Sequence, residues 1–347
     1  MGFKFSLFGL FNRMSDDMGI DLGTANTLVH MKNKGIVLRE PSVVAIEVNT
    51  NEVLAIGEEA KKMLGRTPGN IMPVRPMRDG VISEYETAQI MLKYFIKRAM
   101  GKSTFIRPRV LVGVPSGVTE VEKRAVIDAS LEAGAREAYL IEEPMAAAIG
   151  AGLPVQDACG SMIVDIGGGT CEVAVISLGG IVEKSSVHAA GDALDRAIQL
   201  HVRKKYDLVI GERTAEEVKI AVGNAIMSDE PDSVEIRGRD LRTGLPKNMM
   251  LSANDVCEAI DEPVRSIIMA VRNTLEKTPP ELASDIMLNG IVMTGGTSLL
   301  RNLDRRLSEE TKIPVFVSEE ALNCVAIGTG MAVENIDTYR KGFLMES

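Results

Sequence analysis

Hydrophobic and polar positions along the 347-residue chain follow two periods in turn, one typical of buried strands and one typical of helices with a single apolar face. Between Ser83 and Met100 the apolar residues recur three and four positions apart, which predicts a helix. Short apolar runs predict buried strands at Val110–Val114, Met162–Asp165 and Ile291–Thr294. Because strand and helix patterns alternate throughout, we expect an α/β fold.

Two further helices are predicted from their starting residues. Thr119 is followed by Glu120 and Glu122, so its hydroxyl can cap a helix whose first turn carries acidic side chains. Ser252, with Asp255 three positions later, has the spacing of a capping box. A helix is therefore expected after each of these residues.

The chain contains two internal similarities between its first and second halves. Segment 20–27 resembles segment 164–171, with Asp21 aligned to Asp165, and both read as strand, aspartate, small-residue turn and strand. In the same way, the strand, turn and helix pattern of 110–118 returns at 290–298. A repeated α/β unit predicts two similar domains that face each other across a cleft. The glycine-rich stretch at 150–160 predicts the boundary between them.

Composition is that of an ordinary globular protein, with 45% hydrophobic and 25% charged residues. A net charge of −9 without a basic stripe argues against nucleic acid as a partner. The four cysteines have no CxxC spacing and histidines number three, which argues against zinc and fits reduced thiols in the cytosol. The apolar runs are too short for a bilayer, so no transmembrane helix is expected.

Residues 1–14 form an apolar segment that also carries Lys4 and Arg13. A helical wheel places five apolar side chains on one broad face: Phe3, Leu7, Phe8, Leu10 and Phe11. Such a face can bind the surface of a membrane, and large apolar groups are costly to leave in water. The alternative is a terminal segment that packs on its own domain.

Several nucleotide and hydrolase motifs are missing from the sequence. It has no P-loop motif, no GxGxxG between a strand and a helix, no GxSxG elbow and no HExxH. P-loop, Rossmann, α/β-hydrolase and zincin chemistry are therefore not supported.

The aligned aspartates lead into two turns of small residues, Gly23–Asn26 and Gly167–Thr170. Turns of this kind can present several backbone N–H groups to phosphate oxygens. Asp21 and Asp165 would repel a phosphate unless a cation lay between, which indicates Mg²⁺ held through water. One such turn alone would be read as an ordinary hairpin, but two in register predict a nucleotide.

Two other segments have more than one interpretation. The segment 142–150 predicts a helix that opens on Pro144, where Glu143 either caps the helix dipole or orients a water that attacks a phosphate. Gly295–Thr297 ends a buried strand before the leucines of an expected helix. It either allows a flat ligand to lie on the backbone or forms a tight turn.

These features together resemble the actin/Hsp70/sugar-kinase ATPase superfamily, and within it the MreB/Mbl family. The resemblance extends over nearly the whole chain. It is carried by GIDLGTANTL (19–28), GIVLREPSVVA (35–45), MLGRTPG (63–69), RPMRDGVI (75–82), EEPMAAAIGAGLP (142–154), VDIGGGT (164–170) and TPPELASDI (278–286).

The resemblance implies two actin-like domains around a nucleotide cleft, domain I at 15–154 plus 323–347 and domain II at 155–322. It implies ATP with Mg²⁺, and it assigns roles to individual residues. The metal-associated acids are Asp21 and Asp165. The phosphate-binding residues are Gly23, Thr24, Ala25, Asn26, Gly167, Gly168 and Gly169. The residues that position the attacking water are Glu143 and Thr170. The adenosine-side residues are Glu216, Lys219, Gly295, Gly296 and Thr297.

The resemblance also implies a slow ATPase that forms head-to-tail filaments of paired protofilaments. These would lie on the inner face of the cell membrane and direct wall synthesis and rod shape with membrane proteins of the elongation machinery. Phe105 and Ile106 match an apolar membrane-binding loop. The sequence departs from the family at Thr297, which replaces a usual glycine, and also at Cys171, Ala190, Ile220 and Ala221.

Three other functions are alternatives to the cytoskeletal one. A small-molecule kinase on the same fold is the main alternative, and it would need an acceptor site that the sequence does not reveal. A chaperone ATPase would need a substrate-binding domain after the ATPase. A scaffold that binds nucleotide without hydrolysis is disfavoured by Glu143 and Thr170.

Overall fold

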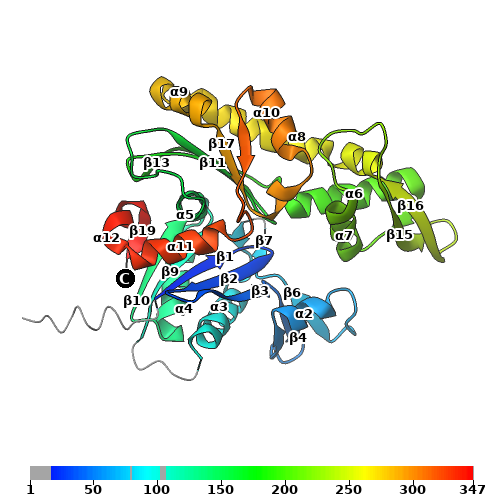
Figure 1. The fold of residues 1–347 in the computed structure, drawn as a ribbon. Helices are drawn as coiled ribbons and strands as arrows, with labels where there is room; N and C mark the ends of the chain where they lie inside the picture. Colours follow the sequence, from blue (N-terminus) through cyan, green and yellow to red (C-terminus); the bar gives the residue numbers. More distant parts are fainter. Residues whose placement is uncertain (1–16, 79, 102–106, 347) are drawn as a thin grey trace, which may run out of the picture. The chain divides into compact units, whose positions relative to one another are not determined.

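The computed structural model describes residues 17–78, 80–101 and 107–346, and the chain divides into two compact units. The first unit contains the described residues up to Gly152 and those from Asn323 onward, and the second contains Leu153–Leu322. Figure 1 shows that each unit has its own sheet and its own helices. The predicted membrane residues in 1–14, together with Phe105 and Ile106, lie outside the described residues.

A six-stranded sheet forms the centre of the first unit, in the order β19-β10-β9-β1-β2-β3. Its strands are β1 Met18–Leu22, β2 Asn26–Met31, β3 Gly35–Pro41, β9 Arg109–Val114, β10 Glu137–Glu142 and β19 Phe343–Glu346. β1 and β2 form an antiparallel hairpin, whereas β1, β9 and β10 run parallel. The parallel strands therefore end at one common edge of the sheet.

Helices cover both faces of this sheet. They are α3 Tyr85–Met100, α4 Glu120–Ala133, α5 Glu143–Gly150, α11 Cys324–Glu334 and α12 Ile336–Tyr339, with a 3₁₀ turn at Arg340–Gly342. The apolar faces of α3 and α4 pack against alternate strand residues such as Ile20 and Val112. The other set of alternate residues contacts α11, because Gly19 and Gly113 lie directly beneath it. One core thus lies between the sheet and the α3–α4 pair.

A small additional sheet belongs to the same unit, in the order β5-β4-β6. Its strands are β4 Val44–Glu47, β5 Val53–Ile56 and β6 Ile71–Val74, and the helix α2 Glu58–Met63 lies between β5 and β6 in the chain. A separate short hairpin follows, formed by β7 Met77–Arg78 and β8 Val81–Ile82. Its own small core is formed by Val43, Ala45, Ala55 and Ala60.

The second unit repeats the strand arrangement of the first. Its five-stranded sheet has the order β13-β12-β11-β17-β18, with β11–β12 antiparallel and β11–β17–β18 parallel. The strands are β11 Ser161–Ile166, β12 Cys171–Ser177, β13 Gly180–Val187, β17 Ile291–Thr294 and β18 Val315–Val317. This order matches β3-β2-β1-β9-β10, and the predicted internal repeat is thereby seen in the topology.

The helices of the second unit enclose a larger apolar core. They are α6 Gly191–Tyr206, α7 Glu212–Val222, α8 Ala253–Lys277, α9 Pro280–Asn289 and α10 Leu303–Thr311, with a 3₁₀ turn η1 at Gly296–Leu299. A three-stranded sheet is formed by β14 Leu208–Val209, β15 Ser233–Asp240 and β16 Pro246–Ser252. The core joins α6 and α8 to alternate residues of β11 and β12. Asp165 and Glu172 pair with each other across β11 and β12, and they occupy the other set of alternate positions, which is not part of this core.

The predicted strands and both capping boxes are confirmed: Thr119 bonds with Glu122, and Ser252 bonds with Asp255. Three predicted helix starts were wrong. The helix predicted from Ser83 begins at Tyr85, since Ser83 instead bonds to the Pro76 carbonyl. Pro144 is the second residue of α5, which begins one residue earlier. After Gly295 comes a 3₁₀ turn, and α10 begins only beyond Asn302, whose φ of 59° interrupts the helix.

Within the described part of the chain, no helix combines the length and the apolar character needed to cross a bilayer.

Candidate functional site

The first acid-led turn connects β1 to β2 in the first unit. Asp21 lies on β1 opposite Leu28 of β2 and Gly113 of β9, and the turn Gly23–Asn26 follows directly. Ser42 binds this turn from outside: its hydroxyl donates to the Gly23 carbonyl at 2.6 Å and its N–H donates to the Ala25 carbonyl at 3.0 Å. In a trans peptide the N–H points away from the C=O. The bonds from Ser42 therefore set the direction of the N–H groups of the turn.

Glu143 is positioned at the same sheet edge as this turn. Ile141 of β10 and Asp21 of β1 both pair with Gly113 of β9, so β1 and β10 end level with each other. Glu143 is the first residue of α5, directly after β10, and its side chain is buried. Ligands of α/β proteins bind at the carboxyl ends of parallel strands, where this unit places the first turn and Glu143.

Asp165 occupies the matching position on β11 of the second unit. It is 6% exposed, and the Thr294 hydroxyl of β17 donates to its Oδ1 at 3.0 Å. The pKa of Asp165 is raised to about 6, chiefly by burial; the hydrogen bond from Thr294 lowers it and the charge of neighbouring Glu172 raises it. A carboxylate that is desolvated beside a second acid is poised for a cation.

The turn after Asp165 is held by bonds to its carbonyls. Within the turn, the Gly167 N–H donates to the Thr170 carbonyl at 2.9 Å. From outside, the first N–H groups of α6 reach the turn: Gly191 donates to the Gly167 carbonyl at 3.2 Å and Asp192 donates to the Gly168 carbonyl at 2.7 Å. As in the first unit, the turn carbonyls bond to other parts of the fold.

The predicted adenosine turn lies against the predicted phosphate turn in the second unit. Gly295 has φ of 82°, and a Cβ there would come within 2.3 Å of the Ile166 carbonyl oxygen and 2.7 Å of Asp165 Oδ1. Only glycine permits this close crossing. The next residues form η1, whose Thr297 hydroxyl donates to the Gly167 carbonyl at 2.8 Å. The structure thus brings together Asp165, the turn Gly167–Thr170 and the turn Gly295–Thr297.

Lys219 of α7 also joins this group. Its ammonium donates to the Gly191 carbonyl at 3.1 Å and to Asp195 at 2.9 Å. The pKa of Asp195 is raised to about 6, chiefly by burial; Lys219 lowers it, and the charges of Glu216 and Asp192 raise it. Glu216, one helical turn before Lys219, therefore acts on the same cluster through its charge.

Sequence reasoning missed several residues around the two turns. Ser42, Gly191 and Asp192 bond to carbonyls of the turns, whereas Thr294 bonds to Asp165, Asp195 bonds to Lys219 and Glu172 pairs with Asp165 across β11 and β12. Most of them are far along the chain from the residues they contact, and no local pattern marks them. Glu172 had a signal: it is a charged residue at a buried position of the apolar strand β12, 1% exposed and bonded to the Ser186 hydroxyl at 2.7 Å. A buried acid in such a strand is uncommon without a specific role.

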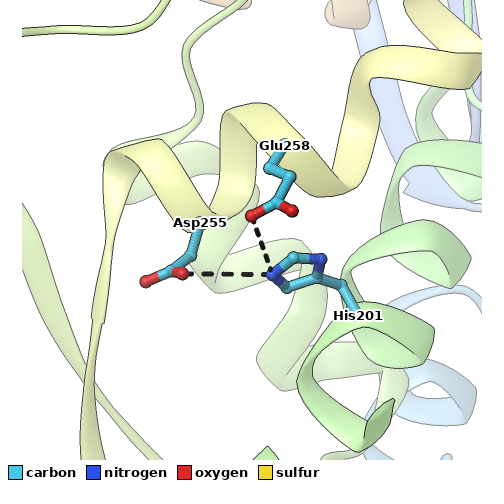
Figure 2. Close-up of side chains that lie close together, drawn as sticks. All are labelled: His201, Asp255 and Glu258. Atoms are coloured by element: carbon cyan, nitrogen blue, oxygen red, sulfur yellow. Dashed lines mark ion pairs between the residues drawn. The ribbon is translucent and has the colours of Figure 1, made fainter. Parts of the chain in front are cut away.

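A separate polar cluster links α6 to α8, as Figure 2 shows. His201 Nε2 lies 3.9 Å from Asp255 and 3.8 Å from Glu258, which is close enough for the three side chains to hold a metal ion. However, the Lys205 ammonium lies 2.9 Å from both carboxylates and supplies the positive charge. The cluster is therefore explained as an ion-pair network between the two helices.

Solved actin-like proteins have folds similar to that of this chain. The crystal structure of MreB5 of Spiroplasma citri bound to ADP is 38% identical with a TM-score of 0.88, over 93% of this chain and 99% of that chain. The same protein bound to AMPPNP also gives a TM-score of 0.88. The MamK double helical filament is 21% identical with a TM-score of 0.76, over 91% of this chain and 98% of that chain. The molecule is an actin-like α/β protein.

The sequence comparisons identify a smaller group of proteins than the fold does. The model of the family described as MreB/Mbl protein matches residues 15–341. The cell shape-determining protein MreB of Escherichia coli (strain K12) is 56% identical over 331 residues, which cover 94% of this chain and 95% of that protein. This chain belongs to the MreB/Mbl family, as the sequence motifs predicted.

Proposed function

We propose that this chain is an actin-like cytoskeletal ATPase that determines cell shape by forming ATP-dependent filaments. The family membership supports this role, since the Escherichia coli relative is named a cell shape-determining protein. The observation that carries the proposal is the pair of acid-led turns at equivalent strand ends, each with its carbonyls bonded from outside. Such turns leave N–H groups to bind phosphate oxygens.

ATP is the nucleotide that we propose for these turns. The Spiroplasma citri relative has been solved with ADP and with AMPPNP. Each turn would contact phosphates from its own domain, the domains being 15–154 with 323–347 and 155–322. Glu216, Lys219 and the turn Gly295–Thr297 would lie on the adenosine side. Bound ATP would then hold the two domains together.

Mg²⁺ fits the acids that precede the two turns. The buried Asp165 carboxylate, with its pKa raised to about 6, is a hard oxygen ligand that a divalent cation would stabilise in its charged form. Asp21 is the matching acid of the first unit, and both would hold the ion through water. When bound, the ion would neutralise charge on the phosphate oxygens.

Hydrolysis would be slow and coupled to polymerisation. Glu143, buried at the start of α5, would orient the attacking water or accept its proton, and Thr170 would position it from the second phosphate turn. Neither residue supplies a covalent step. Loss of the γ-phosphate would remove contacts that favour the filament form of the subunit, so hydrolysis would time disassembly.

The filament would grow through head-to-tail contacts, because an open polymer requires two different surfaces that meet without closing a ring. MamK, which shares the fold, was solved as a double helical filament, so the fold is compatible with such assembly. We propose paired protofilaments for this chain as well.

The filament would lie on the inner face of the cell membrane and act with membrane proteins of the wall-elongation machinery. Residues 1–14, with Phe105 and Ile106, would contact the lipid.

Pelleting at high speed with Mg-ATP tests this function. The samples would be the chain with Mg-ATP, with Mg-ADP and without nucleotide, each with and without anionic liposomes, and the Asp165→Ala variant. We expect wild type to pellet with Mg-ATP, the variant to stay in solution, and liposomes to lower the protein concentration required. A protein that binds ATP but stays in solution under every condition would contradict the filament proposal. Phosphate transfer to an added sugar would instead favour a kinase.

A further inference from the structure

Two backbone carbonyls of the second phosphate turn are bonded to three donors from elsewhere in the second unit. The Gly167 carbonyl accepts from the Gly191 N–H at 3.2 Å and from the Thr297 hydroxyl at 2.8 Å. The Gly168 carbonyl accepts from the Asp192 N–H at 2.7 Å. Two of these donors are backbone groups that almost any residue could supply. The Thr297 hydroxyl is the side-chain donor among them.

Thr297 is itself held firmly in place. Its side chain is 6% exposed and lies in η1, between the Gly295 turn and Leu300. Gly295 donates from its N–H to the Ala321 carbonyl at 2.8 Å, and the Ser298 hydroxyl donates to the Gly295 carbonyl at 2.6 Å. Thr297 also contacts the start of α6, since a Cβ added to Gly191 would come within 3.0 Å of its hydroxyl oxygen. The hydroxyl therefore has little freedom to leave the Gly167 carbonyl.

Because the peptide bond is planar, the hydrogen bond to the Gly167 carbonyl also sets the direction of the Gly168 N–H. The C=O of Gly167 and the N–H of Gly168 belong to one trans peptide and point in opposite directions. A donor that fixes the carbonyl on one side fixes the N–H on the other. Preorganised N–H groups bind phosphate more tightly than mobile ones, because no ordering is required when the ligand arrives.

We propose that Thr297 is a positioning residue for the phosphate turn, whose hydroxyl holds the Gly167 carbonyl so that the Gly168 N–H faces the nucleotide phosphates. This inference rests on the proposed ATP binding. It gives Thr297 a phosphate-side role in addition to its predicted place beside adenosine. Thr297 also connects the adenosine side of the proposed nucleotide site to the phosphate side, because it lies directly after the Gly295 turn and its hydroxyl bonds to Gly167.

Four proteins test the proposal: wild type, Thr297→Val, Thr297→Ser and Thr274→Val. Valine keeps the shape of threonine but removes the hydroxyl, and serine retains the hydroxyl. Thr274 is the matched control, because it is also buried and its hydroxyl also donates to a carbonyl, that of Ala270 at 2.9 Å, within α8. For each protein we would measure hydrogen–deuterium exchange of the 167–170 amides without nucleotide, the Kd values of Mg-AMPPNP and of adenosine, and the Tm.

We expect Thr297→Val to accelerate exchange of the turn amides and to weaken Mg-AMPPNP binding about fivefold, the ordinary effect of one hydrogen bond. Adenosine binding should change less than about twofold, since adenosine carries no phosphate. Thr297→Ser should restore both properties, and Thr274→Val should lower the Tm without changing either.

Unchanged exchange and Mg-AMPPNP binding in Thr297→Val would overturn the proposal, as would an equal loss of adenosine and Mg-AMPPNP affinity. If the valine variant does not fold, Thr297→Ala, which removes the same hydroxyl without adding a methyl group, is judged by the same criteria. Failure of wild type to bind Mg-AMPPNP would instead contradict the proposed ATP function, while the exchange comparison would still decide whether Thr297 orders the turn.

Discussion

At the scale of single residues, two buried aspartates differ in their surroundings. Asp165 is buried beside Glu172, and its raised pKa means that its charge is unfavourable in the fold without a cation. Asp17 is equally buried but is bonded to the Arg109 guanidinium and backbone. The charged form of Asp165 destabilises the fold and fits a site for a cation, whereas Asp17 holds the starts of β1 and β9 together.

Asp165→Asn is therefore expected to stabilise the protein without ligand while it weakens Mg-ATP binding. The amide retains an oxygen for the Thr294 hydroxyl and removes the desolvated charge, a gain of about 1–3 kcal/mol. The pKa of Asp165 is raised from 3.8 to about 6 on folding, so the charged form destabilises the fold above that pH. The penalty fades as the pH falls towards the unfolded value.

Thermal melting at about pH 7.5 and about pH 5 measures this effect, because the wild-type carboxylate takes up a proton between these values. The Tm advantage of Asp165→Asn should shrink at the lower pH. Asp165→Ala serves as the control, because it removes both the charge and the oxygen that accepts the hydrogen bond from Thr294. A variant that melts below wild type at the higher pH would contradict the account of Asp165 as a costly charge.

At the scale of elements, helix pairs depend on contacts that no single element contains. α5 and α11 touch through their backbones: a Cβ on Gly328 would lie 1.8 Å from the Ala146 carbonyl oxygen. Alanine normally favours a helix over glycine by about 1 kcal/mol. At position 328 the close contact between α5 and α11 makes glycine the more favourable residue.

Gly328→Ala is expected to destabilise the first unit by more than about 3 kcal/mol, because α5 and α11 would have to separate. Urea unfolding followed by circular dichroism measures the change. Gly69→Ala is the matched control: no atom lies within 4 Å of its added Cβ, and its effect should stay within about 0.5 kcal/mol. Similar stability of the two variants would show that the helix contact is less close than described.

The network between α6 and α8 supports a second prediction at this scale. Burial would raise the pKa of Asp255, but hydrogen bonds from Lys205, Ser252 and Tyr206 outweigh it and lower the pKa well below the usual range. A carboxyl group whose pKa is lowered on folding contributes its full stability above the unfolded value near 4, and the contribution is lost as the pH falls from there through the lowered pKa of the folded state.

Asp255→Asn should therefore cost about 1–2 kcal/mol near neutral pH and somewhat less at about pH 3, where only part of the contribution is lost because the pKa in the folded protein lies lower still. Denaturant unfolding at the two pH values provides the comparison. Glu309→Gln, which breaks the exposed pair with Arg305 on α10, should change stability by less than about 0.5 kcal/mol. A cost that does not depend on pH would rule out the carboxylate charge as its source.

At the scale of the whole molecule, filament formation and membrane binding should be separable. Deletion of residues 1–14 should reduce cosedimentation with anionic liposomes at least about tenfold while Mg-ATP-dependent pelleting continues. Phe8→Ser together with Phe11→Ser should reproduce the loss, and Phe5→Ser, on the other side of the helical wheel, should matter less. Equal effects of all the serine variants would argue against an amphipathic helix, and lost pelleting would argue that the segment belongs to the filament.

The sequence alone determined the α/β class, the two acid-led turns and both capping boxes, because each depends on residues close together in the chain. The internal repeat and the family followed from matching such local segments one by one. Periodicity, glycine and capping spacing are local properties, and they survive in any fold that contains the segment. Only the tertiary structure decided which distant groups support the turns. Ser42 and Thr294 are ordinary hydroxyl residues in sequence, and Thr297 is predicted there only beside adenosine. Their bonds to Gly23, Asp165 and Gly167 exist because folding brings distant segments together. Hydrogen bonds act over about 3 Å, so their partners are set by folding and not by spacing along the chain.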